Sequence, residues 1–223
     1  MKATAVIALA ASVVGCVCPA AAQTLAAVVE DVRGNPGVAF MDYVEAGRVF
    51  QLGPKDSIVL GYIKSCVRET IAGGTITIGA DRSHVEAGRV ERAIVACDAE
   101  RMFLTSQPAN ETAGMVFRSW DRRRQLPEPQ FTLFGASPII QAAGGGRVII
   151  ERLDATNERH VVPLTKSPGG DIFDFARSGA ALVPGGLYRA VANGHEMIFK
   201  VAASAKPGHT PVVGRLIRFA PAN

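Results

Sequence analysis

The sequence predicts an all-β protein made of two small antiparallel β domains of the sandwich or roll type. Glycine and proline are frequent, with 23 and 13 residues among 223, and they interrupt every apolar run before a helical stripe can form. The runs between them are short and rich in valine and isoleucine, which favours strands. The stretch TITIG at 75–79 alternates cleanly, as a half-buried strand does.

Residues 1–22 predict a signal peptide that is removed by cleavage before Gln23. A basic second residue precedes an uncharged apolar run, and small residues follow at Ala20 and Ala22. We therefore expect a periplasmic or secreted protein with no transmembrane segment in the mature chain. The stretch VVGC ending at Cys16 resembles the lipobox of bacterial lipoproteins. Anchoring through an acylated Cys16 is the alternative.

The mature chain divides into two predicted β domains, residues 24–117 and 131–220. Between the strands lie turn-forming stretches such as GPKD and AGG, in which Gly, Pro and Asp favour chain reversal. Predicted strands of the first domain lie at 25–32, 37–44, 48–52, 57–67, 75–79, 89–97 and 101–106. Predicted strands of the second domain lie at 131–141, 146–154, 159–166, 171–175, 187–194, 196–202 and 212–219.

The hexapeptide VEAGRV occurs twice, at 44–49 and at 85–90. A true duplication would align the flanking residues as well, yet FQLG follows the first copy and ERAI follows the second. We therefore interpret the two copies as equivalent turns between strands, and we expect Gly47 and Gly88 to lie in those turns.

Residues 118–130, RSWDRRRQLPEPQ, form a basic connector that contains proline. Charge runs of this kind are typical of a solvated linker between domains. The alternative is an anion-binding patch for lipid phosphates or an acidic partner, with Trp120 as an aromatic contact. The residues of this possible patch are Arg118, Arg122, Arg123 and Arg124.

Cys66 and Cys97 are the cysteines that remain after signal-peptide removal. Two cysteines in an oxidising compartment pair as a rule, so a disulfide between them is predicted. The stretch SCVRE at 65–69 also resembles the S-x-G-C-x-R motif of L,D-transpeptidases, although Ser65 replaces the glycine. That resemblance implies an enzyme with a Cys66 thiolate as nucleophile, for which His84 is the candidate base.

The stretch LVPGGLYRAV resembles a corner of fibronectin type III domains, because it has their L-x-P-G-x-x-Y spacing. The matching residues are Leu182, Pro184, Gly185 and Tyr188. The resemblance implies an immunoglobulin-like sandwich in which the tyrosine hydroxyl makes a hydrogen bond to the upstream backbone.

The first domain resembles the FecR-like periplasmic β domain, in which G-x-x-x-x-L-x-x-x-D-x-I precedes a glycine-rich strand run. The residues that carry the resemblance are Gly47, Leu52, Asp56 and Ile58, followed by IAGGTI at 71–76. The resemblance implies a non-catalytic interaction module of the cell envelope.

Composition and motifs exclude several functional classes. The formal charge of +4 is too small and too dispersed for a nucleic-acid-binding surface. The four histidines are scattered, and no metal-binding or nucleotide-binding motif occurs, so no cofactor or metal is predicted. We expect a non-catalytic binding or interaction module whose partner is another envelope protein or a component of the envelope. The cysteine-dependent cell-wall peptidase or transpeptidase is the alternative.

Overall fold

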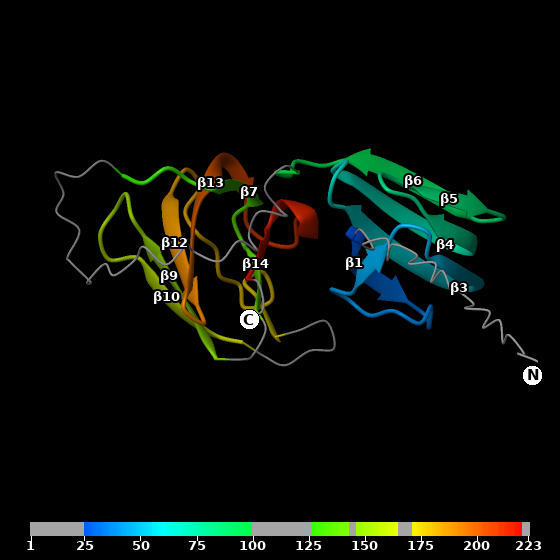
Figure 1. The fold of residues 1–223 in the computed structure, drawn as a ribbon, viewed down its shortest axis with the longest axis horizontal. Coiled ribbons are helices and arrows are strands. Elements are labelled where there is room, and N and C mark those ends of the chain that lie inside the picture. The colour runs from blue at the N-terminus through cyan, green and yellow to red at the C-terminus, as the bar shows by residue number, and fades with distance from the viewer. Residues whose placement is uncertain (1–24, 100–125, 143–145, 165–170, 220–223) are drawn as a thin grey trace, which may run out of the picture.

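The protein is built from β-strands gathered into two lobes that lie side by side (Figure 1). The computed structural model describes residues 25–99, 126–142, 146–164 and 171–219. The first lobe, residues 25–99, contains β1 (Leu25–Arg33), β2 (Tyr43–Glu45), β3 (Val49–Tyr62), β4 (Val67–Ile78), β5 (Ser83–Glu86) and β6 (Arg89–Ile94). The second lobe, made of the described residues from 126 to 219, contains β7 (Phe131–Gly135), β8 (Ile139–Ala142), β9 (Arg147–Arg152), β10 (Arg159–Pro163), β11 (Asp171–Asp174), β12 (Leu187–Ala192), β13 (His195–Lys206), a 3-10 helix (Val212–Gly214) and β14 (Leu216–Arg218). The predicted all-β fold class is confirmed.

Some predicted segments cannot be compared with these strands. The signal peptide at 1–22, the strand at 101–106 and most of the linker at 118–130 lie outside the described residues. Within the described ranges, no helix has the length and apolar character needed to cross a bilayer.

The first lobe is one sheet that bends back on itself. Its strands follow the order β2-β1-β3-β4-β5, and β6 pairs with β4 along the same edge as β5. The second half of β3 and the first half of β4 pair with each other and with β1 and β6, whereas β5 pairs with the other half of β4. Both halves bury side chains in one core: Phe50 and Ile76 come from one half, and Leu60 and Ile71 from the other.

A bulge in the middle of the β3–β4 hairpin accompanies the bend. Residues 53–56 interrupt the ladder opposite Gly73, next to the pair Leu52–Gly74. The φ angles of Gly73 and Gly74, 63° and 83°, are accessible to glycine without strain. The turns predicted at GPKD and AGG do not form, so this prediction is wrong. The two turn-forming stretches face each other across the hairpin, so they bend two continuous strands instead of ending them.

The repeated hexapeptide forms two turns, as predicted. Gly47 lies in the turn between β2 and β3, and Gly88 lies in the bend between β5 and β6. The strand predicted at 37–44 is much shorter, because the residues before Tyr43 form a turn. The carboxylate of Asp42 stabilises that turn by accepting a hydrogen bond of 2.8 Å from the backbone N–H of Ala39.

The second lobe is two sheets packed face to face. One has the order β10-β9-β12-β13-β7, and the other has the order β11-β8-β14. Their shared core includes the stacked rings of Phe131, Phe199 and Tyr188. The domain was predicted to be antiparallel, yet β7 pairs with β13 and β8 pairs with β14 in parallel. Both parallel pairs join strands far apart in sequence, as parallel pairing requires a long connection.

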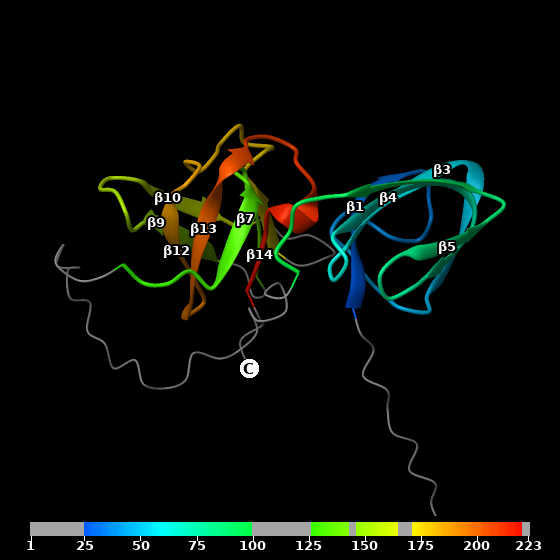
Figure 2. The same cartoon turned by 90° about the horizontal axis from the view of Figure 1, so that it is seen from above.

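An apolar cluster joins the two lobes. The 3-10 helix of the second lobe faces β1 of the first lobe (Figure 2). The buried residues of this junction cluster are Val28 and Met41 of the first lobe and Ile139, Val212, Val213 and Leu216 of the second. The hydroxyl of Tyr43 also donates a 2.7 Å hydrogen bond to Gln141 of the other lobe. The lobes therefore share a buried apolar interface.

Candidate functional site

The junction between the lobes borders a cleft of about 420 Å³, which is our candidate functional site. Both lobes line it, and six of the lining residues are charged. Three of these are acidic and three are basic. The residues that line the cleft are Glu30, Asp31, Phe40, Arg68, Asp174, Arg177, His209, Thr210, Pro211, Val212 and Arg215.

The wall from the first lobe contains a buried carboxylate, that of Glu30. The register of β1 shifts between Val29 and Asp31, so Glu30 lies at an irregularity that can redirect a side chain. Its Oε2 lies 2.7 Å from Nε of Arg68, and its Oε1 accepts a hydrogen bond of 3.3 Å from the backbone N–H of Val213. Glu30 thus pairs within its own lobe and also contacts the other.

The wall from the second lobe contains a buried ion pair between Asp174 and Arg215. Nη1 of Arg215 lies 2.7 Å from the carboxylate and donates a second hydrogen bond of 3.0 Å to the carbonyl of Ser137. Nε of Arg215 donates to the carbonyl of Thr210 at 2.8 Å. Both side chains are less than 5% exposed, at 3% and 4%. Each charge is neutralised by its partner. Because Asp174 lies in β11 and Arg215 lies just before β14, the pair also links these two segments.

Three further ionisable groups of the cleft face solvent. The side chain of Arg177 is 64% exposed, and its Nε lies 3.7 Å from Asp174. Its guanidinium also lies over the ring of Phe40 in the first lobe, 5.0 Å from the ring centroid. Asp31 is exposed and has no ion-pair partner among the described residues, and His209 is exposed as well. These groups are available to a ligand.

The predicted disulfide is present at the edge of the junction. Cys66 and Cys97 lie at bonding distance, with their Cα atoms 5.7 Å apart, and Cys97 packs against the junction cluster. The enzyme hypothesis expected a free Cys66 thiol beside His84. In this structure Cys66 is bonded to Cys97, and the exposed His84 side chain on β5 contacts Glu86 at 3.3 Å.

No protein family, curated protein or solved structure with which we compared this chain matches it. Among the described residues, no group of three or more His, Cys, Asp or Glu side chains is placed to hold a metal ion. The possible anion-binding residues Arg118, Arg122, Arg123 and Arg124 lie outside those residues.

The predicted tyrosine corner forms the hydrogen bond that its sequence implies. The backbone N–H of Val183 donates to the Tyr188 hydroxyl at 2.8 Å, and that hydroxyl donates to Glu158 at 2.7 Å. Leu182 is buried, and Pro184 and Gly185 form the turn between Val183 and Tyr188. The Tyr188 hydroxyl therefore both accepts and donates a hydrogen bond, as expected of a structural group.

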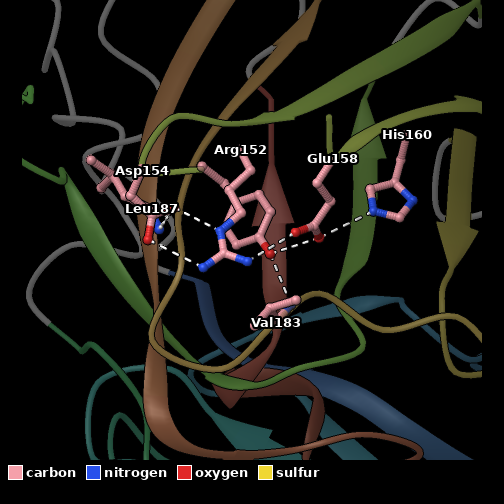
Figure 3. A network of polar contacts seen from close by, with 7 residues as sticks. Arg152, Asp154, Glu158, His160, Val183 and Leu187 are labelled. Atoms are coloured by element: carbon pink, nitrogen blue, oxygen red, sulfur yellow. Dashed lines mark hydrogen bonds and ion pairs between the residues drawn. The ribbon is translucent and has the colours of Figure 1, made fainter. Parts of the chain in front are cut away.

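A network of ion pairs extends from this corner (Figure 3). Arg152 lies between Asp154, at 2.7 Å, and Glu158, at 3.3 Å, and His160 lies 3.4 Å from Glu158. Asp154 also accepts a hydrogen bond of 3.2 Å from the backbone N–H of Leu187. The hydrogen bond from Arg152 holds the pKa of Asp154 below its ordinary value. The network fixes the β9–β10 loop against the start of β12. Its charged groups are paired with one another, which is typical of a structural network.

The three tyrosines of the chain are all expected to ionise late in the folded protein. Burial raises the pKa of Tyr43 and of Tyr62 to about 12, and burial with the Glu158 contact raises the pKa of Tyr188 further. Because these pKa values exceed the unfolded value of about 10, the stability they contribute is complete below pH 10 and is lost as the pH rises through 12.

Absorbance at 295 nm during an alkaline titration measures this ionisation. The native protein should show almost no phenolate near pH 10, whereas the urea-unfolded chain should titrate with a midpoint of about 10. The variant Tyr43→Phe should remove a third of the final absorbance change. Tyr62 and Tyr188 should still ionise at a higher pH than in the unfolded chain. A tyrosine that titrates near pH 10 in the native protein would contradict the burial described above.

The charged residues of the cleft were not singled out from the sequence. One signal was present: Glu30 and Arg215 are charges within apolar runs, LAAVVEDV and VVGRLIRF. A charge in a buried run needs a partner, so such residues mark ion pairs or sites. Arg68 belongs to the transpeptidase-like stretch SCVRE but was not expected in a cleft, and no sequence pattern identified Arg177. Both residues line the same cleft, one from each lobe.

Proposed function

We propose that this protein is an exported, non-catalytic binding or interaction module of the cell envelope that acts through the cleft between its lobes. The observation that carries the proposal is that some charged groups of the cleft are bonded to partners whereas others are exposed to solvent. Glu30 and Asp174 are buried and bonded to arginines, whereas Arg177, Asp31 and His209 are exposed. The ion pairs shape the walls, and the exposed groups without a close partner make contact with a ligand.

The pairing of the two buried carboxylates supports a structural role for them and not a catalytic one. A general acid or base must exchange a proton with the substrate, so it needs an accessible group with a suitable pKa. The two buried carboxylates of the cleft instead accept hydrogen bonds from Arg68, Val213 and Arg215. A nucleophilic Cys66 would require the disulfide to be absent.

The architecture of the second lobe supports an interaction module of the immunoglobulin or fibronectin type III kind. If β7 to β13 are given the letters A, B, C, C′, E, F and G, the order β10-β9-β12-β13 becomes C′-C-F-G, and β8 beside β11 becomes B beside E. Tyr188 lies near the start of β12, where that fold places its corner tyrosine. The predicted signal peptide and the resemblance of the first lobe to the FecR-like domain support a periplasmic or secreted location, with an envelope protein or component as partner.

Photocrosslinking in the native host tests whether the cleft is the binding surface. A photoreactive phenylalanine analogue replaces Phe40 in the cleft, and the matched control places it at Val161, which is exposed on the edge strand β10 outside the cleft lining. We expect a defined adduct from position 40 in the envelope fraction and no such adduct from position 161. Identical adduct patterns from both positions, or none from position 40, would refute the proposal.

A further inference from the structure

We infer that the cleft binds a short zwitterionic peptide, whose carboxylate contacts Arg177 and whose ammonium group contacts Asp31. This inference rests on the proposed function of the cleft and specifies its ligand. It follows from the balance of charges in the cleft, from the position of the two exposed groups and from the size of the space between the lobes.

The charge balance favours a ligand that carries both signs. Of the six charged lining residues, Glu30 and Arg68 neutralise each other, and Asp174 and Arg215 do the same. Arg177 and Asp31 remain, one positive and one negative. A purely anionic ligand would approach Asp31 unfavourably, and a purely cationic one would approach Arg177 unfavourably, because like charges at close range destabilise a complex.

Arg177 has the geometry to receive a carboxylate. Its one ion contact is the 3.7 Å approach of Nε to Asp174, so among the described residues both terminal nitrogens lack a partner. A guanidinium presents parallel N–H donors that match the two oxygens of a carboxylate. The Phe40 ring holds the guanidinium plane from the opposite lobe, at 5.0 Å. A bound carboxylate would thus be held at the point where the lobes meet.

Asp31 supplies the complementary group from the first lobe. It directly follows Glu30 at the irregularity of β1, and its own side chain is exposed. An ammonium group donates three hydrogen bonds and pairs well with such a carboxylate. Because Asp31 and Arg177 come from different lobes, a molecule that contacts both must cross the cleft.

The size and the apolar lining of the cleft fit a small molecule with a backbone and side chains. A volume of about 420 Å³ falls within the usual range of small-ligand pockets. Phe40, Pro211 and Val212 supply apolar contacts between the charged ends. These features match a peptide of a few residues with free termini.

Isothermal titration of the full mature chain with trialanine and its capped forms tests the assignment of both ends. We expect trialanine to bind, and we expect N-acetylation or C-amidation to weaken binding by at least about tenfold, the loss of one charged contact. In Asp31→Asn the N-acetyl and free peptides should bind equally. In Arg177→Gln the amidated and free peptides should bind equally. Each variant should thus make binding insensitive to capping of one peptide terminus and leave it sensitive to capping of the other.

Matched controls come from the exposed ion pair Arg89–Glu91 on β6, outside the cleft. Arg89→Gln and Glu91→Gln should bind all peptides as the wild type does. Unchanged thermal midpoints of Asp31→Asn and Arg177→Gln would show that both variants fold, as expected for exposed side chains. Phosphoethanolamine serves as a zwitterion without a carboxylate and should bind more weakly than trialanine.

The possible failures are distinguishable. If no trialanine binding is measured, or if capped and free peptides bind alike in the wild type, the peptide assignment is wrong. Stronger binding of phosphoethanolamine would also overturn the carboxylate assignment. In each of these cases a specific adduct at position 40 would still support the cleft as the binding surface, whereas loss of that adduct would refute the proposed function as well.

Discussion

Replacing Arg215 with alanine is expected to lower the free energy of unfolding by about 3 to 5 kcal/mol, the usual cost of removing one partner of a buried ion pair. Asp174 would remain as a buried charge, with a side chain only 4% exposed. The carbonyl oxygens of Ser137 and Thr210 would lose their donor as well. Urea unfolding followed by circular dichroism measures the change.

Two variants separate this effect from a general loss of charge. Arg177→Ala removes the other guanidinium near Asp174, but that side chain is 64% exposed, so its removal should cost less than about 1 kcal/mol. The double variant Arg215→Met with Asp174→Leu should recover most of the lost stability, because it leaves no buried charge unpaired. If Arg215→Ala costs no more than Arg177→Ala, the buried pair does not stabilise the second lobe as described.

Loss of the disulfide between Cys66 and Cys97 is expected to lower the free energy of unfolding by about 3 to 4 kcal/mol. The bond closes a loop of sequence separation 31 and so limits the freedom of the unfolded chain. At roughly 2 to 4 °C per kcal/mol for a chain of this size, the thermal midpoint should fall by roughly 10 °C in the double variant Cys66→Ala and Cys97→Ala.

Reduction provides the matched comparison. A phosphine reductant should lower the midpoint of the wild type to that of the double variant and should leave the double variant unchanged. Alkylation of the unreduced protein, followed by peptide mapping, should find both residues protected. Alkylated Cys66 in the folded, unreduced protein would contradict the disulfide and would restore the thiolate that the transpeptidase-like alternative requires.

Features that depend on local sequence were predictable. The strands follow from short apolar runs, and the corner hydrogen bond joins Val183 to Tyr188, five residues apart. The turns at Gly47 and Gly88 follow from local chain reversal in the same way. The disulfide was predictable for a different reason, because the expected compartment and the count of cysteines left one pair.

Features that depend on packing between distant segments were not predictable. GPKD and AGG each favour a turn in isolation, and only their position opposite each other makes them a bulge within long strands. The partner of Glu30 lies 38 residues away in sequence, and the partner of Arg215 lies 41 residues away. An apolar run that contains one charge indicates that a partner exists, but the fold alone determines which residue it is.

The shared cluster between the lobes also determines the order in which the protein can mature. Ribosomal synthesis makes Val28 and Met41 well before Val212, Val213 and Leu216. Until those late residues arrive, the early ones expose an apolar surface that invites association with other chains. The apolar face of the first lobe is therefore covered only after the second lobe has been made, and a chaperone that protects this surface would act during that interval.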